Sequence, residues 1–139
     1  MEGYHSTVLL KETIEALEIK QGSWYLDCTL GDGGTSCEIL GLGGRIVGID
    51  VDPEALERTR ERFERLGVEK SKYRLIRGNF RELENLILQI PIESGQTGQK
   101  DHKFKGVIFD LGVSSLQLET PQRGFSFSQN GPLDMRMDP

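Results

Sequence analysis

The sequence predicts an α/β fold built on a parallel sheet, and three observations support this prediction. Short apolar segments alternate along the chain with segments of helical periodicity. The expected strands are almost continuously apolar, which is typical of parallel strands covered on both faces. A glycine-rich turn directly follows the first expected strand. Such alternation predicts right-handed crossovers that place helices on both faces of the sheet.

The order of the expected elements is one helix followed by four strands that alternate with three helices. The first helix is expected over residues 7–18, because apolar residues recur there at helical spacing. The expected strands span residues 24–29, 45–51, 73–77 and 105–111. The other expected helices span residues 36–40, 53–66 and 81–89.

Individual residues in the sequence also predict where helices end and where loops lie. Asp52 and Pro53 predict the start of helix 53–66, with Asp52 as its cap, and Gly67 predicts its end. Residues 91–103 are polar and aperiodic, which predicts a surface loop. Residues 112–139 contain turn residues and isolated aromatics with no clear period.

The composition is that of an ordinary globular protein, and it excludes several classes. The chain has 139 residues, and its 17 Lys+Arg against 22 Asp+Glu give a net charge of -5. An acidic chain is a poor non-specific ligand for nucleic acid, so an RNA role needs a local basic patch or a further segment. No apolar run predicts a membrane span, and the N-terminus lacks a secretory pattern. Cys28 and Cys37 have no metal-site spacing, so we expect no metal and a reducing cytoplasm.

A glycine turn and a carboxylate suggest an adenosine-type ligand. Gly31, Gly33 and Gly34 open a helix after the first expected strand, although Ser36 replaces the third glycine of G-x-G-x-x-G. Asp50 ends the second strand, where a carboxylate accepts hydrogen bonds from a ribose diol in dinucleotide-binding and related folds. A plain tight turn and a solvated strand-end aspartate remain as alternatives.

Two further strand ends contribute candidates to the same crevice. Phe80 follows the third strand in a Gly-Asn-Phe turn, where it would either flank an adenine ring or belong to the core. Asp110 ends an apolar strand, and a carboxylate there is costly to place unless it meets water, a helix end or a ligand. Because ligands bind at the carboxyl ends of parallel strands, we expect Asp110 to face a ligand.

The chain resembles the bacterial ribosomal RNA small-subunit methyltransferase H family, historically called MraW. The resemblance covers essentially all residues outside the 91–103 loop. The strongest matches are Phe-Asp-Leu-Gly-Val-Ser-Ser-x-Gln-Leu at 109–118, and Arg-Gly-Phe-Ser-Phe through Gly-Pro-Leu-Asp-Met-Arg-Met-Asp at 123–138. Further matches lie at 5–10, 27–34, 48–53 and 78–80.

The resemblance implies a Rossmann-like class I methyltransferase that uses S-adenosylmethionine. It implies methyl transfer to the N4 amino group of a cytidine in the decoding region of 16S rRNA, with the small ribosomal subunit as partner. The implied cofactor contacts are Gly33, Gly34, Thr35, Asp50, Phe80, Asp110 and Gln117. Thr35 stands where the family usually has His, which would be a mild change for a backbone contact and a serious one if the imidazole matters.

Family members typically continue well past residue 139. We therefore expect residues 1–139 to form the N-terminal part of one methyltransferase domain, without its helical substrate-binding insertion and C-terminal strands. The sheet would be truncated to about four strands with one exposed edge, and a separate C-terminal fragment would be a complementing partner.

Asp110 is also the candidate catalytic residue, because a carboxylate that bonds the amino hydrogens of cytosine would raise the nucleophilicity of N4. Phe125 and Phe127 are expected either to stack on a flipped base or to pack the tail onto the sheet. Two other functions remain open. One is a nicotinamide-dependent oxidoreductase, and the other is a non-catalytic remnant that binds the cofactor only.

Overall fold

The structure of the chain is a computed structural model that describes residues 9–90 and 103–139. Its centre is a parallel sheet with the strand order β3-β2-β1-β4. The strands are β1 (Trp24–Asp27), β2 (Arg45–Asp50), β3 (Tyr73–Arg77) and β4 (Gly106–Ile108). The predicted parallel α/β sheet is therefore confirmed.

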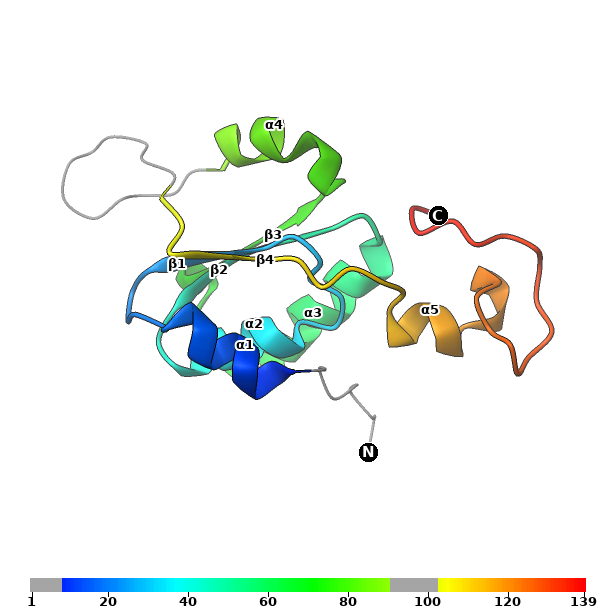
Figure 1. The fold of residues 1–139 in the computed structure, drawn as a ribbon, viewed down its shortest axis with the longest axis horizontal. Helices are drawn as coiled ribbons and strands as arrows, with labels where there is room; N and C mark the ends of the chain where they lie inside the picture. Colours follow the sequence, from blue (N-terminus) through cyan, green and yellow to red (C-terminus); the bar gives the residue numbers. More distant parts are fainter. Residues whose placement is uncertain (1–8, 91–102) are drawn as a thin grey trace.

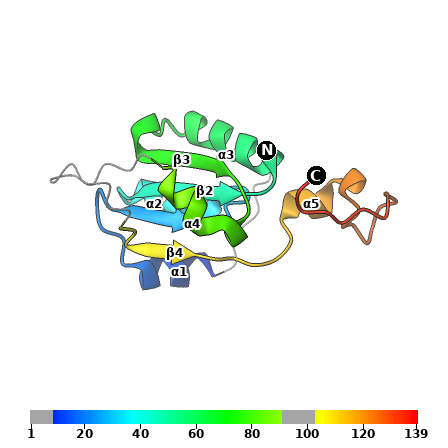
Figure 2. The same ribbon diagram turned by 90° about the horizontal axis from the view of Figure 1, so that it is seen from above.

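Helices cover both faces of the sheet (Figure 1). The helices are α1 (Leu10–Leu17), α2 (Gly34–Gly41), α3 (Pro53–Arg65), α4 (Leu83–Leu88) and α5 (Ser115–Glu119). Helices α1, α2 and α3 lie on one face and α4 lies on the other, while α5 lies beyond the end of the sheet (Figures 1 and 2). None of these helices is both long and apolar enough to cross a bilayer.

An apolar cluster fills the interface on each face of the sheet. Tyr25, Ile46 and Phe63 are completely buried on the side of α1, α2 and α3. Leu26 and Val47 are buried on the side of α4. Because successive strand side chains point to opposite faces, neighbouring residues of β1 and β2 supply both clusters. The near-continuous burial of β1 and β2 explains their apolar sequence, whereas β3 and β4 at the two edges are only partly buried.

The expected helix boundaries agree with the structure to within a few residues. Asp52 caps α3, since its side chain accepts a hydrogen bond of 3.0 Å from the N–H of Glu54. Gly67 follows α3 with φ 69°, a left-handed conformation that favours glycine. Residues 7 and 8 of the first expected helix lie outside the described residues, as does the expected loop except for Lys103.

Strand β4 is shorter than the segment 105–111 that the sequence predicts. It pairs only with β1, whose last residue, Asp27, stands opposite Ile108. Residues 109–111 therefore continue past the end of their partner strand. Within the described residues no strand lies on the other side of β4, so β4 is an edge strand of this sheet.

Helix α5 was not predicted from the sequence. Ser114 and Gln117 form a capping box at its start, in which each side chain accepts a hydrogen bond from the backbone N–H of the other residue. The spacing Ser-x-x-Gln was the available signal. Residues 112–139 extend past the carboxyl ends of the strands (Figure 2).

Gly33 allows a close approach between the glycine turn and α3. It has φ 69°, and a Cβ atom added to it would lie 2.7 Å from Cγ2 of Thr59. Gly67 has the same φ, but a Cβ atom there would meet nothing within 4 Å. Both glycines thus have a left-handed backbone, but only at Gly33 would an added Cβ atom collide with a neighbouring side chain.

We predict that Gly33→Ala destabilises the protein more than Gly67→Ala. The left-handed φ alone costs an alanine about 1 kcal/mol, and overpacking against Thr59 adds about 1–3 kcal/mol at Gly33. Denaturant unfolding of both variants measures the difference in free energy of unfolding. Equal losses at the two positions would show that the contact with Thr59 is not a constraint.

Candidate functional site

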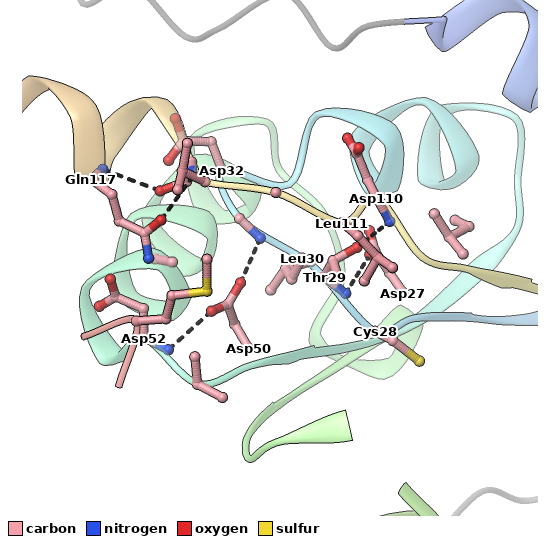
Figure 3. A pocket seen from close by; sticks show the side chains of 18 of the residues that line it. Asp27, Cys28, Thr29, Leu30, Asp32, Asp50, Asp52, Asp110, Leu111 and Gln117 are labelled. Carbon is pink, nitrogen blue, oxygen red and sulfur yellow. Dashed lines mark hydrogen bonds between the residues drawn. The ribbon is translucent and has the colours of Figure 1, made fainter. Parts of the chain in front are cut away.

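A cavity of about 490 Å³ lies at the carboxyl ends of the strands, and Figure 3 shows it from close by. The turns after β1, β2, β3 and β4 all contribute to its walls, as expected for a parallel α/β sheet. Six of the seven predicted cofactor contacts line it, namely Gly34, Thr35, Asp50, Phe80, Asp110 and Gln117. Their proximity agrees with one common site, while their individual roles stay predictions.

Asp50 connects two of the turns that form the cavity. Its Oδ2 accepts a hydrogen bond of 2.8 Å from the N–H of Gly31, and its Oδ1 accepts one of 2.9 Å from the N–H of Asp52 (Figure 3). Burial raises the pKa of this carboxyl above its ordinary value, while the backbone N–H bonds oppose the shift. Because each carboxylate oxygen can accept a second bond, Asp50 can still receive the two hydroxyls of a ribose.

Asp27 is a functional candidate that sequence reasoning missed. It ends β1, lines the cavity and is almost fully buried. It accepts hydrogen bonds from the hydroxyl of Ser36 at 2.8 Å and from the N–H of Thr29 at 3.2 Å. Burial raises the pKa of Asp27 to about 6, and the nearby Asp50 and Asp110 contribute in the same direction. An aspartate that ends an apolar strand was the available signal, and the same signal identified Asp110.

The glycine turn between β1 and α2 is held from the side of α3. Gly31 and Gly33 have positive φ values of 51° and 69°. Nε of Arg58 lies 3.3 Å from Oδ1 of Asp32, and Arg62 donates a 2.9 Å hydrogen bond to the carbonyl oxygen of Asp32. These contacts hold the turn, so that the first residues of α2 reach the cavity.

Gly33 lies apart from the other six residues that the sequence predicts to contact the cofactor. Gly33 does not line the cavity, and its open side faces Thr59 of α3. Gly34 and Thr35 line the cavity from the first turn of α2, where backbone N–H groups lack intrahelical acceptors. A contact between Gly33 and a ligand stays a prediction, and the structure gives this glycine a packing role.

Phe80 belongs to the cavity wall, so the alternative that places it in the core is wrong. It is 42% exposed and packs edge-to-face against Phe109, with ring centroids 5.6 Å apart. An exposed aromatic ring beside a cavity offers a flat apolar surface to a planar ligand. Phe125 and Phe127 do not line the cavity, and Phe127 is fully exposed.

Asp110 lies at the rim of the cavity on the residues that follow β4 (Figure 3). Its backbone N–H donates a 2.7 Å hydrogen bond to Oγ1 of Thr29, which ties this turn to the turn after β1. The residue is exposed, so its carboxylate is accessible to a ligand. With Asp27 and Asp50 it makes the site acidic, which favours a ligand that carries positive charge.

Gln117 and Met137 close the cavity from residues 112–139. Gln117 is 5% exposed, and its Oε1 accepts a 2.9 Å hydrogen bond from the N–H of Ser114. Its amide NH₂ group remains as a donor. The residues that the structure describes contain no cluster of His, Cys, Asp and Glu that could hold a metal ion.

Solved structures similar to this chain are methyltransferases and related enzymes. An rRNA methylase from Streptococcus thermophilus is 24% identical, with a TM-score of 0.51 over 60% of this chain and 50% of that one. A precorrin 8w decarboxylase from Methanobacterium thermoautotrophicum is 25% identical, with a TM-score of 0.54 over 64% and 46%. An RNA methyltransferase from Salinibacter ruber, in complex with S-adenosyl-L-homocysteine, is 21% identical, with a TM-score of 0.51 over 58% and 52%.

These similarities show the class I methyltransferase fold. The chain spans about half the length of the solved structures that it matches. The model of the MraW methylase family matches residues 2–139, which is nearly the whole sequence. The chain therefore belongs to the MraW methylase family.

Proposed function

We propose that this chain carries the S-adenosylmethionine site of an RNA methyltransferase that modifies the N4 amino group of a cytidine in the decoding region of 16S rRNA. Membership of the MraW methylase family supports methyl transfer and S-adenosylmethionine as its donor. The observation that carries the proposal is the Asp50 carboxylate, which lines one cavity together with the glycine turn and Phe80. The small ribosomal subunit in the cytoplasm is the proposed partner.

The residues of the cavity fit the chemical groups of this cofactor. Asp50 retains acceptor capacity for a ribose diol, and Phe80 offers an exposed ring for adenine. The carboxylates of Asp27 and Asp110 suit the positive charges of a sulfonium and an α-amino group. A volume of about 490 Å³ lies within the usual range for small-molecule sites. When bound, the cofactor supplies a methyl group that its sulfonium has already activated.

Asp110 is the proposed acceptor for the nucleophile. The lone pair of cytosine N4 is delocalised into the ring, so the amino group attacks weakly unless an acceptor bonds its hydrogens. Asp110 is accessible at the rim, and the bond from its N–H to Thr29 holds its backbone in place. The carboxylate can orient the amino group and take up its proton, while the rest of the site contributes orientation.

Thr35 should be a mild departure from the histidine usual in the family. It is buried in the first turn of α2, where its backbone N–H can serve a ligand whatever the side chain is. We propose that residues 1–139 supply the cofactor half of the domain and that a further C-terminal segment supplies most contacts with RNA. The net charge of -5 favours this division, because phosphate binding needs clustered cations.

We predict that the chain binds S-adenosylmethionine and S-adenosylhomocysteine and that Asp50→Asn weakens both by about tenfold or more. The amide cannot accept the same set of hydrogen bonds from the ribose and from the two backbone N–H groups. Titration calorimetry measures the affinities, and Glu119→Gln, which neutralises an exposed acid, is the matched control. Folded wild-type protein that gives no heat with either compound would contradict the cofactor assignment, and NAD binding would support the oxidoreductase alternative.

We predict that the preference for S-adenosylmethionine over S-adenosylhomocysteine falls by about threefold or more between pH 7.5 and pH 5. Asp27, with a pKa of about 6, is mostly ionised at the higher pH and mostly protonated at the lower one. The two compounds differ by the sulfonium charge, so groups common to both cancel in the ratio. The ratio should change less in Asp27→Asn, and an equally steep change there would assign the effect to another carboxyl.

We predict that methyl groups from labelled cofactor enter 16S rRNA as N4-methylcytidine when the chain is incubated with small ribosomal subunits and the C-terminal half of a complete family member. Asp110→Asn should lower the rate by about 100-fold or more, because the amide cannot take up the proton. Mass spectrometry of nuclease digests identifies the product. Cofactor binding without incorporation under these conditions would favour the non-catalytic alternative.

A further inference from the structure

Residues 112–139 form one wall of the cavity although many of their apolar side chains are exposed. Gln117 and Met137 line the cavity from this segment. The side chains of Phe127 and Leu133 are fully exposed, and Met135 is 68% exposed. Leu116 is buried in α5 and Phe125 is half-buried, so the start of the segment has apolar support. Apolar burial contributes little at residues 127–135, so polar contacts help to hold the far part of the wall.

Arg123 connects this segment to the body of the fold. Its guanidinium lies 2.5 Å from Oδ2 of Asp52, at the start of α3. It also donates hydrogen bonds of 3.3 Å to the carbonyl oxygens of Arg136 and Met137. One side chain thus joins α3 to the two residues at the far end of the segment.

The Arg123–Asp52 pair is shielded from water on both sides. Arg123 also lies 3.8 Å from Oε2 of Glu54, whose side chain is exposed. The side chains of Arg123 and Asp52 are 10% and 3% exposed. The pair between Arg77 and Asp138 has side chains that are 56% and 63% exposed. Exposed ion pairs contribute little, whereas breaking a buried pair leaves an uncompensated charge. Arg123 is therefore the main anchor of the wall.

The anchor is connected to the group proposed to bind the cofactor. Asp52 donates its N–H to Oδ1 of Asp50, and Asp50 accepts the N–H of Gly31 through Oδ2. The two carboxylate oxygens of Asp52 have different partners, since Oδ1 caps α3 and Oδ2 meets Arg123. A continuous network therefore runs from the wall to the glycine turn.

We propose that Arg123 is a positioning residue of the cofactor site. It holds Met137 and the segment that carries Gln117 against the cavity, and through Asp52 it supports the carboxylate of Asp50. The inference rests on the proposed function, because it assumes that the cavity binds S-adenosylmethionine. Without the anchor the wall loses its buried contact with α3, and a bound cofactor is released faster.

The test compares Arg123→Ala with Asp52→Asn in the full chain. Asparagine caps a helix as well as aspartate does, so Asp52→Asn keeps the start of α3 and removes the buried ion pair. Arg123 then keeps only its 3.8 Å pair with the exposed Glu54. Both variants should weaken S-adenosylhomocysteine binding by about tenfold, mainly through a faster dissociation rate. Because the two residues act as one pair, the double variant should bind no more weakly than either single variant.

Arg136→Ala is the matched control, because it removes one positive charge from the same segment. The guanidinium of Arg136 forms an exposed pair with Asp134, and its carbonyl oxygen remains available to Arg123. The affinity of this variant should stay within about twofold of wild type. Arg123→Lys keeps the charge beside Asp52 but loses the forked guanidinium, so it should recover part of the lost affinity.

Hydrogen exchange separates an anchored wall from a general loss of stability. In unliganded Asp52→Asn, amides of residues 112–139 should exchange faster, while those of α3 stay protected. If Arg123→Ala does not fold, Asp52→Asn alone carries the test. The inference would be overturned if wild type binds S-adenosylhomocysteine and Asp52→Asn binds it with the same affinity. It would also be overturned if the loss of affinity in the double variant equalled the sum of the two single losses. If wild type does not bind, the proposed function fails first and this inference fails with it.

Discussion

The site depends on a single carboxylate that holds two turns together. Asp50 accepts N–H groups from the glycine turn after β1 and from the residue that caps α3. Hydrogen bonds to an ionised acceptor are stronger than those between neutral groups. The group that we propose to bind the ligand is therefore also the group that orders the walls of the cavity. A site ordered before binding loses less conformational entropy when a ligand arrives.

The cavity contains carboxylates whose burial disfavours their ionised form. Asp27 is almost fully buried, and its raised pKa shows that burial opposes its ionisation despite the hydroxyl of Ser36. Asp50 is shifted in the same direction and for the same main cause. A cationic ligand would offset this burial effect by stabilising the ionised carboxylates. Binding and folding stability are then linked, because a ligand that prefers the folded state stabilises it.

Much of the fold could be predicted from the sequence because its signals are local. Strand apolarity and the Asp52 cap depend on neighbouring residues, and the carboxyl ends of parallel strands must meet at one edge. The packing role of Gly33 could not be predicted, because it depends on Thr59 in another helix. The pair between Arg123 and Asp52 joins residues 71 positions apart, and no local pattern encodes such a contact.

The surface beside the cavity constrains how RNA would approach. Phe109, Leu111 and Val113 follow β4 as exposed apolar side chains past the end of the sheet, and Leu111 and Val113 also line the cavity. Together with an acidic cavity they offer little attraction to phosphates, which bind to clustered cations. Apolar and aromatic side chains instead suit an unstacked base, whose face is planar and uncharged. The proposed chemistry therefore assigns base contacts to these apolar residues and phosphate contacts to a more basic surface elsewhere.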